Sequence, residues 1–192
     1  MSTDGSDETV ETVVLDVLPN GRPDDDRPPS QRAPVAYALD TDSFGLYELT
    51  LSEDAHVLVG NRLVVAPHEE RDEEVIAATE TSYEEVSGAA RSELEYVIEE
   101  LIEEEEDRFV DFFNEAQPIT LRLHQLNLLP GIGKKLRNDI LDERKREPFD
   151  SFEDIAERVS GLHHPKDVLV ERITEELRDD DLKYCIFARE EE

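Results

Sequence analysis

Apolar residues in the first half of the chain fall in short runs that predict β-strands. The segments 10–18, 35–39, 44–51 and 75–79 are rich in β-branched and aromatic residues, with Gly, Pro, Asn or Asp close to their ends. The segment 57–66 has the character of a strand pair or of one bent strand, because Gly60-Asn61 interrupts it. Five short strands predict a small antiparallel β-barrel at 10–80. The oligonucleotide-binding (OB) type fits this pattern, and an SH3-like barrel fits it equally.

From residue 81 onward the apolar spacing becomes that of helices. Ser82 and Glu85 form a capping pattern, and apolar residues three or four positions apart predict one long helix at 89–116. The segment 81–117 is therefore expected to bridge two domains. Its glutamates crowd together at 99–107, which is typical of a solvated helix face. A metal site there would need convergent ligands, which this spacing does not specify.

The segment 118–181 predicts a tandem of helical hairpins. Apolar residues at 121, 123, 126 and 129 predict a helix at 119–129, which Pro130-Gly131 ends, and 134–146 predicts a second helix. Helices at 152–159 and 165–178 predict a second copy, in which His163 stands where a second glycine belongs, so its role is expected to be structural. The chain thus predicts an α+β protein with a C-terminal helical domain, a disordered acidic tail at 1–9 and a final strand and tail at 182–192.

The turn after Pro130 has the features of a phosphate site. Glycines let another molecule approach the main chain closely, and the helix that follows presents free N–H groups and a positive dipole end. Basic side chains stand within one turn of that end. The candidate residues are Gly131, Ile132, Gly133, Lys134, Lys135 and Arg137. A purely structural turn with solvated lysines is the alternative.

Charge supports this assignment. The chain has 50 acidic and 20 basic residues and a net charge of −30, as in proteins of organisms that accumulate salt; a generally acidic protein is the alternative. Between 119 and 149, however, there are seven basic residues and only four acidic ones, which indicates a polyanion site. Secondary contacts are predicted at Arg122, Arg144, Lys145 and Arg146, and at Arg22, Arg27 and Arg32 of the proline-rich loop 19–34. The arginines of that loop fit local pairing with Asp24–Asp26 equally well.

Several classes of function find no support. A single cysteine excludes an internal disulfide and a multi-cysteine zinc site, and His163-His164 lacks further ligands. We therefore expect no metal, no cofactor and no small-molecule substrate. Without an apolar run of membrane-spanning length, a soluble cytoplasmic protein is expected. Gly133-Lys134 is not followed by the Ser or Thr of a nucleotide-binding loop. An enzyme that acts on DNA is the catalytic alternative; resemblance of the turn to that of certain DNA-repair enzymes would put Lys145 and Asp150 in range of a catalytic role, although the sequence pattern of those enzymes is absent around them.

The stretch 128–135 resembles the helix-hairpin-helix motif of nucleic-acid-binding proteins, whose loop has the pattern hydrophobic-Pro-Gly-hydrophobic-Gly followed by basic residues. This resemblance implies that loop amides and the adjacent lysine hold backbone phosphates without reading bases. Together with 18–29, 90–94 and 112–120, the stretch 129–135 also resembles an archaeal family catalogued as domain of unknown function 655.

The family resemblance implies an OB-like part, a helix-hairpin-helix part and a nucleic-acid-binding protein without enzymatic activity. An association of that family with genes of translation and ribosomal RNA modification favours RNA over DNA, and ribosomal or other translation proteins as further partners. Two alternatives stay open. One is a DNA-binding accessory protein of repair or recombination, and the other is an adaptor that binds proteins through its acidic helix.

Overall fold

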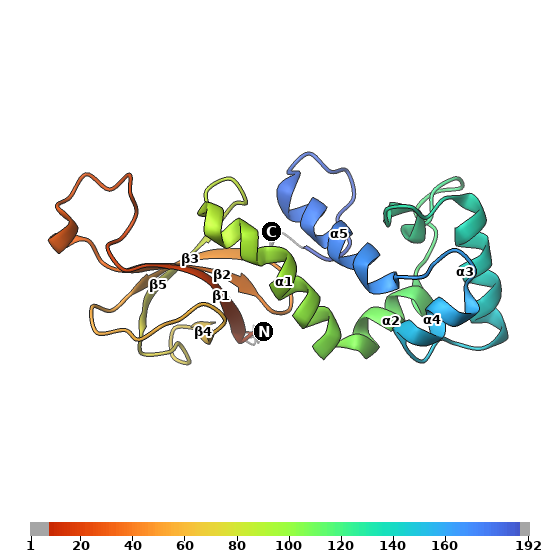
Figure 1. Cartoon of the computed structure of the whole chain (residues 1–192), viewed down its shortest axis with the longest axis horizontal. Coiled ribbons are helices and arrows are strands. Elements are labelled where there is room, and N and C mark those ends of the chain that lie inside the picture. The colour runs from red at the N-terminus through yellow and green to blue at the C-terminus, as the bar shows by residue number, and fades with distance from the viewer. Residues whose placement is uncertain (1–7, 189–192) are drawn as a thin grey trace, which may run out of the picture. The chain divides into compact units, whose positions relative to one another are not determined.

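The computed structural model describes residues 8–188, which form two compact units (Figure 1). One unit contains the chain up to Val97 together with Phe187 and Ala188, and the other runs from Ile98 to Ile186. The boundary falls within the first helix, α1 (Gly88–Glu104). In broad terms the protein is α+β, as the sequence predicts.

The first unit is built on a five-stranded antiparallel sheet. Its strands are β1 (Val10–Leu18), β2 (Val35–Asp40), β3 (Leu46–Leu51), β4 (Arg62–Ala66) and β5 (Val75–Thr81), in the spatial order β4-β1-β2-β3-β5. They lie where the sequence predicts strands, except that 57–61 forms a turn at Gly60, whose φ is 87°. A short 3-10 helix, η1 (Pro29–Gln31), lies in the long β1–β2 loop.

Burial follows the position of each strand in the sheet. The central strand β2 is buried at every residue, as expected for a strand covered on both faces. One face carries a core of aliphatic side chains: Val14, Ala36, Ala38, Leu49, Leu51, Val57, Leu63, Val65 and Val75. At the start of α1, the Ser87 hydroxyl donates to Asp16 of β1 at 2.6 Å and accepts from the Ala90 amide at 3.1 Å. These bonds fix the first turn of α1 to the sheet.

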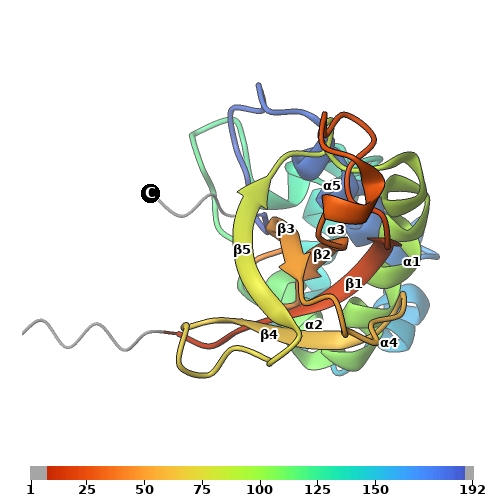
Figure 2. The same ribbon diagram turned by 90° about the vertical axis from the view of Figure 1, so that its left-hand side faces the viewer.

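The closed OB-like barrel predicted from the sequence is wrong. The sheet is a curled half-barrel in which β4 and β5 are the two edges and are not hydrogen-bonded neighbours (Figure 2). Arg71 in the loop between them donates from Nε to the Val65 carbonyl at 2.9 Å and from Nη1 to the Ile76 carbonyl at 3.0 Å. A loop side chain therefore spans the position where a closed barrel would have main-chain hydrogen bonds.

The second unit contains the end of α1 and five further helical segments. These are α2 (Glu106–Glu115), the 3-10 helix η2 (Gln125–Leu128), α3 (Lys134–Arg146), α4 (Phe152–Arg158) and α5 (Pro165–Arg178). The single long acidic helix expected at 89–116 is two helices, because Glu105 leaves the helical conformation with φ −111° and ψ 40°. Closely spaced like charges destabilise a helix interior, whereas Glu106 and Asp107 are favourable in the first turn of a new helix.

The expected C-terminal helix-hairpin-helix domain is also corrected by the structure. Its first predicted helix, 119–129, is instead a tight turn followed by the four-residue η2, and the helices are interspersed with turns from Gly88 onward. A bridge between Pro118 and His124 closes the turn and prevents helical winding. The spacing of apolar residues wrongly predicted a helix here, because Leu121 is not part of a buried face but points fully outward, with a relative exposure of 106%.

The predicted C-terminal strand is absent over 182–188, where the chain forms bends and irregular structure. Side chains of α5 bind this segment's main chain instead: Arg172 donates to the Tyr184 carbonyl, and the Ile186 amide donates to Glu176 at 2.7 Å. These contacts explain why no strand pairs there. Most of the predicted acidic tail at 1–9, and the last residues of the predicted strand and tail, lie outside the described residues.

Candidate nucleic-acid interface

The turn between η2 and α3 has one glycine that the backbone requires and one that it does not. Gly131 has φ 77°, a left-handed conformation that strains residues with a Cβ. Gly133 has φ −86° and ψ −169°, which any residue adopts, and a Cβ built on it meets no atom within 4 Å. Between them, Ile132 is buried and anchors the turn to the core. Within the part of the chain that the structure describes, nothing therefore explains the glycine at 133.

Gly133 is also the N-cap of α3, and no side chain caps the helix there. The first bond of the helix runs from the Arg137 amide to the Gly133 carbonyl at 3.0 Å, so the amides that precede Arg137 have no partner within the helix. The first turn contains no acidic residue. In a chain with 50 acids, this helix start presents amides and positive charge together.

The three basic side chains of the first turn differ in their surroundings. Lys134 is exposed. Lys135 pairs with Asp139 at 2.9 Å, although 88% of its side chain is exposed. Arg137 is half-buried and donates to Asn127 and Asn138 at 3.2–3.3 Å. Lys134 and Arg137 are therefore better placed than Lys135 to hold an anion, because Lys135 is partly neutralised.

Asn127 ties the turn to the segment before it. Its Oδ1 accepts from the His124 amide and from Arg137 Nη1, both at 3.2 Å, and its Nδ2 donates to the Ile132 carbonyl at 3.2 Å. His124 completes a reciprocal cap, because its Nδ1 accepts from the Leu126 amide at 3.1 Å. One amide side chain thus fixes the base of the 118–124 turn, the glycine turn and the arginine relative to one another.

Burial of His124 lowers the pKa of its imidazole, and the nearby Arg144 and Arg137 lower it further. A neutral ring is also required by its hydrogen bond, since Nδ1 acts as an acceptor. The folded state therefore resists protonation of a group that the unfolded chain protonates at its ordinary pKa of 6.5.

We expect the free energy of unfolding to fall as the pH drops below about 6.5, with a contribution from His124 that continues down through its lowered folded pKa. The sign follows because the unfolded state binds more protons in this window. The variant His124→Asn keeps an acceptor near the Nδ1 position and does not titrate, so its stability should depend less on pH between 7 and 5. Urea unfolding at several pH values measures this, and equal pH dependence in both proteins would contradict it.

The second glycine turn, at 159–164, lacks these properties. Gly161 has φ 97°, and its added Cβ would lie 3.8 Å from Leu136 of α3, so this glycine serves the fold. Asp167 stands in the first turn of α5. Hydrogen bonds to Glu103 and Glu99 hold Lys166 and raise its pKa to about 12. Its positive charge is already neutralised, which agrees with a structural role for this turn.

Most of the arginines predicted to make secondary contacts with nucleic acid form ion pairs or hydrogen bonds within the protein. In the first unit, Arg22 pairs with Asp24 and Glu48, Arg27 pairs with Asp25, and Arg32 donates to the main chain of the same loop. Hydrogen bonds from Arg27 hold the pKa of Asp25 at about 2. Arg22 and Arg27 therefore make the local aspartate pairs of the alternative interpretation, whereas Arg32 binds main-chain carbonyls of the loop.

In the second unit, one predicted contact residue binds the main chain and three are exposed. Arg144 donates to the Phe113 and Ala116 carbonyls at 3.1 and 3.0 Å, so it caps α2, and burial lowers its pKa. Arg146 pairs with Glu143 at 3.1 Å but stays 77% exposed. Arg122 and Lys145 are exposed. Of this group, Arg122, Lys145 and Arg146 present charge to the surface.

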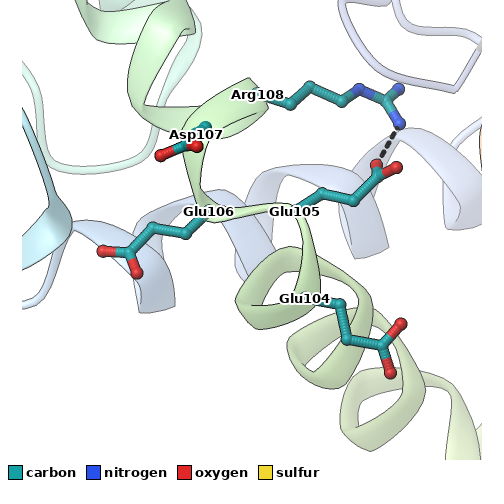
Figure 3. Close-up of a pocket in the computed structure, with 5 residues that line it drawn as sticks. All are labelled: Glu104, Glu105, Glu106, Asp107 and Arg108. Carbon is teal, nitrogen blue, oxygen red and sulfur yellow. Dashed lines mark hydrogen bonds and ion pairs between the residues drawn. The ribbon is translucent and has the colours of Figure 1, made fainter.

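The acidic junction of α1 and α2 does not form a convergent metal site. Its carboxylates surround an open depression of about 340 Å³, and Figure 3 shows Glu106 and Asp107 on one side of the junction and Glu104 pointing away from them. Glu105 pairs with Arg108 at 2.8 Å. Across residues 8–188, no group of three or more His, Cys, Asp or Glu is placed to hold a metal ion. Within the same residues, no helix has both the length and the apolar character needed to cross a membrane.

A family model described as "Protein of unknown function (DUF655)" matches residues 8–189. This chain belongs to that family. It is 38% identical over 177 residues to the uncharacterized protein MJ0038 of Methanocaldococcus jannaschii, covering 92% of this chain and 78% of the relative. The crystal structure of Af1531 from Archaeoglobus fulgidus, assigned to DUF655, is 41% identical with a TM-score of 0.85. That match covers 94% of this chain and 99% of the other.

Both DUF655 relatives are archaeal, so the archaeal family inferred from the sequence is confirmed. Sequence reasoning missed two side chains that shape the candidate interface, His124 and Asn127. Their spacing could have been recognised, because a hydrogen-bonding residue followed three positions later by another is the pattern of a reciprocal cap. It was hidden by the apolar residues around it, which suggested a longer helix.

Proposed function

We propose that this DUF655 protein is a non-enzymatic nucleic-acid-binding protein that holds backbone phosphates at the turn 130–134 and the first turn of α3. The observation that carries the proposal is the uncapped helix start at Gly133. Its amides lack intrahelical partners, the space around its Cα is open, and no acid stands in the first turn. A phosphate oxygen supplies the acceptors that such amides lack.

The proposed site uses main-chain amides first and side chains second. Gly131 shapes the turn, and Gly133 leaves room for the phosphate. Lys134 and Arg137 then add charge, with Lys135 in a minor role because of its pair with Asp139. Lys145 lies eleven residues beyond Lys134 on the same stripe of α3, roughly 16 Å along the axis. That spacing lets it reach a second phosphate of the same ligand.

We further propose RNA as the preferred ligand and a salt-rich archaeal cell as the setting. The RNA preference, and a role in ribosome biogenesis or translation beside ribosomal proteins, rest on the family resemblance. The salt-rich setting rests on the net charge of −30. At about 1 M salt the Debye length is roughly 3 Å, so long-range attraction is screened and short hydrogen bonds to phosphate gain in importance.

Fluorescence anisotropy in high KCl tests the proposal with structured RNA, single-stranded RNA and duplex DNA. Gly133→Val is expected to weaken RNA binding by about ten- to a hundredfold, because its methyl groups cover the amides that hold the phosphate. Lys135→Ala should weaken binding by less than about threefold, because an exposed charge contributes little. Equal losses in the two variants, or a larger loss for Lys135→Ala, would contradict a main-chain site.

A matched control is available in the first unit. Gly88 also stands at a helix start with nothing within 4 Å of its added Cβ, so Gly88→Val should leave binding unchanged. Circular dichroism of the valine variants checks that each one folds. Tight binding to duplex DNA alone would move the protein toward repair or recombination. No binding to any nucleic acid would refute the proposal.

A further inference from the structure

Leu121 is the most exposed large apolar residue of the described chain, with a relative exposure of 106%. It stands at the tip of the turn 118–124, next to the exposed Arg122. A side chain at such a tip buries nothing within the protein. Single exposed leucines are common on protein surfaces, so exposure alone assigns no role. The rigidity of the tip and its neighbours distinguish this one.

The turn that carries Leu121 is held by hydrogen bonds at every level. The Ile119 and Thr120 amides donate to the Leu123 carbonyl at 2.8 and 3.0 Å. The Thr120 hydroxyl accepts from the Arg122 and Leu123 amides at 3.2 and 3.0 Å. Below them, Pro118 and His124 form an antiparallel bridge. A tip built this way loses little conformational freedom on binding, so it is preorganised for contact.

The same tip is attached directly to the proposed phosphate site. Asn127 bonds to the His124 amide at the base of the turn, and it also bonds to Ile132 and Arg137. Leu121 stands three residues from that base, which places it within roughly 10 Å of His124. A nucleic acid held at Gly133 would therefore pass within a few nucleotides of Leu121.

Local charge identifies the kind of partner. Arg122 stands next to the tip, and Lys134 and Arg137 stand in the first turn of α3, within a chain whose net charge is −30. A basic partner protein would be repelled from this area, whereas a polyanion would be attracted to it. Apolar side chains are known to insert between bases and unstack them, and leucine is among those that do so.

We propose that Leu121 is a wedge that inserts beside a base, so that the protein prefers RNA with an unpaired or bulged nucleotide over a continuous duplex. This inference rests on the proposed phosphate site. The bound phosphate fixes the strand at Gly133, and the rigid tip then meets a base a few nucleotides away. A bulge is favoured because its base is already unpaired, which lowers the energy needed to unstack it. Arg122 stabilises the adjacent phosphate.

The experiment uses an RNA hairpin with a single-nucleotide bulge of 2-aminopurine, and the same hairpin without the bulge. With wild-type protein, we expect 2-aminopurine fluorescence to rise on binding, and the bulged RNA to bind about tenfold more tightly. Leu121→Ser should abolish the rise and reduce the preference to less than about twofold. Leu121→Ser should retain binding to the continuous hairpin. Its loss of affinity for the bulged RNA should be the same in low and high KCl.

Leu58→Ser is the matched control, because Leu58 is 70% exposed in a turn of the first unit and should change neither readout. Binding of wild type without a fluorescence rise or bulge preference overturns the wedge and leaves the phosphate site intact. A wild-type dimer that Leu121→Ser dissociates assigns the tip to a second copy and overturns it too. If wild type binds neither RNA hairpin and no DNA, the phosphate site is refuted, and the wedge is refuted as well because it depends on that site.

Discussion

Replacing Arg172 with leucine is expected to lower the free energy of unfolding of the second unit by about 3–5 kcal/mol. Arg172 and Glu176 form a buried pair at 3.0 Å on α5, with side-chain exposures of 7% and 0%. Arg172 also donates to the Leu128 carbonyl at the end of η2 and to the Tyr184 carbonyl. The substitution removes the Arg172 guanidinium from beside the buried Glu176 carboxylate, and it releases both carbonyls.

Urea unfolding followed by circular dichroism measures this loss. Arg178→Leu is the control, because Arg178 lies exposed in the last turn of the same helix and should change stability by less than about 0.5 kcal/mol. The double variant Arg172→Leu/Glu176→Leu should recover part of the loss, since the buried carboxylate is removed together with its arginine. A loss below about 1 kcal/mol for Arg172→Leu would show that the pair is not important to stability.

The second large effect is expected for Arg158→Lys, which retains the charge but should destabilise the second unit by about 2–3 kcal/mol. Arg158 Nη2 donates to the Glu143 and Glu147 carbonyls at the end of α3, at 2.7 and 2.6 Å. Its guanidinium also lies 4.6 Å from the centre of the Phe149 ring and pairs with Asp154. Lysine offers one compact ammonium group, which cannot reproduce this fork or stack on the ring.

Arg146→Lys is the matched control for charge and position. Arg146 pairs with Glu143, a residue that Arg158 also contacts, but 77% of its side chain is exposed. Its replacement should change stability by less than about 0.5 kcal/mol. If the two lysine variants have the same urea midpoint, the carbonyl contacts of Arg158 do not stabilise the end of α3.

These arginines show where charge counting from sequence fails. The count between 119 and 149 predicted a basic surface, and part of it is real at Lys134 and Lys145. Arg144, however, donates its hydrogen bonds to carbonyls at the end of α2. In the same way, Arg158 donates to a carbonyl at the end of α3 and Arg172 to one at the end of η2. Sequence shows that an arginine is present, but only the packing of helices shows which carbonyls it binds.

Local patterns predicted the positions of the strands and the starts of α3, α4 and α5 well, because turn residues and caps act over a few positions. The prediction of a helix at 119–129 failed because His124 and Asn127 offered the main chain a competing set of hydrogen bonds. Whether the barrel closes could not be predicted from the sequence either. It depends on how far the sheet curls and on what fills the seam between its edges, which no local pattern encodes.

That seam has a consequence for contacts between copies of the protein. A sheet edge with unpaired amides and carbonyls is a template on which another chain can add a strand and begin to aggregate. Here Asp72 takes both main-chain groups of Val64 on β4, at 2.7 and 3.0 Å, and Arg71 takes carbonyls from both edges. Strand addition at this seam would first have to displace the loop, so the half-barrel resists fibre formation without being closed.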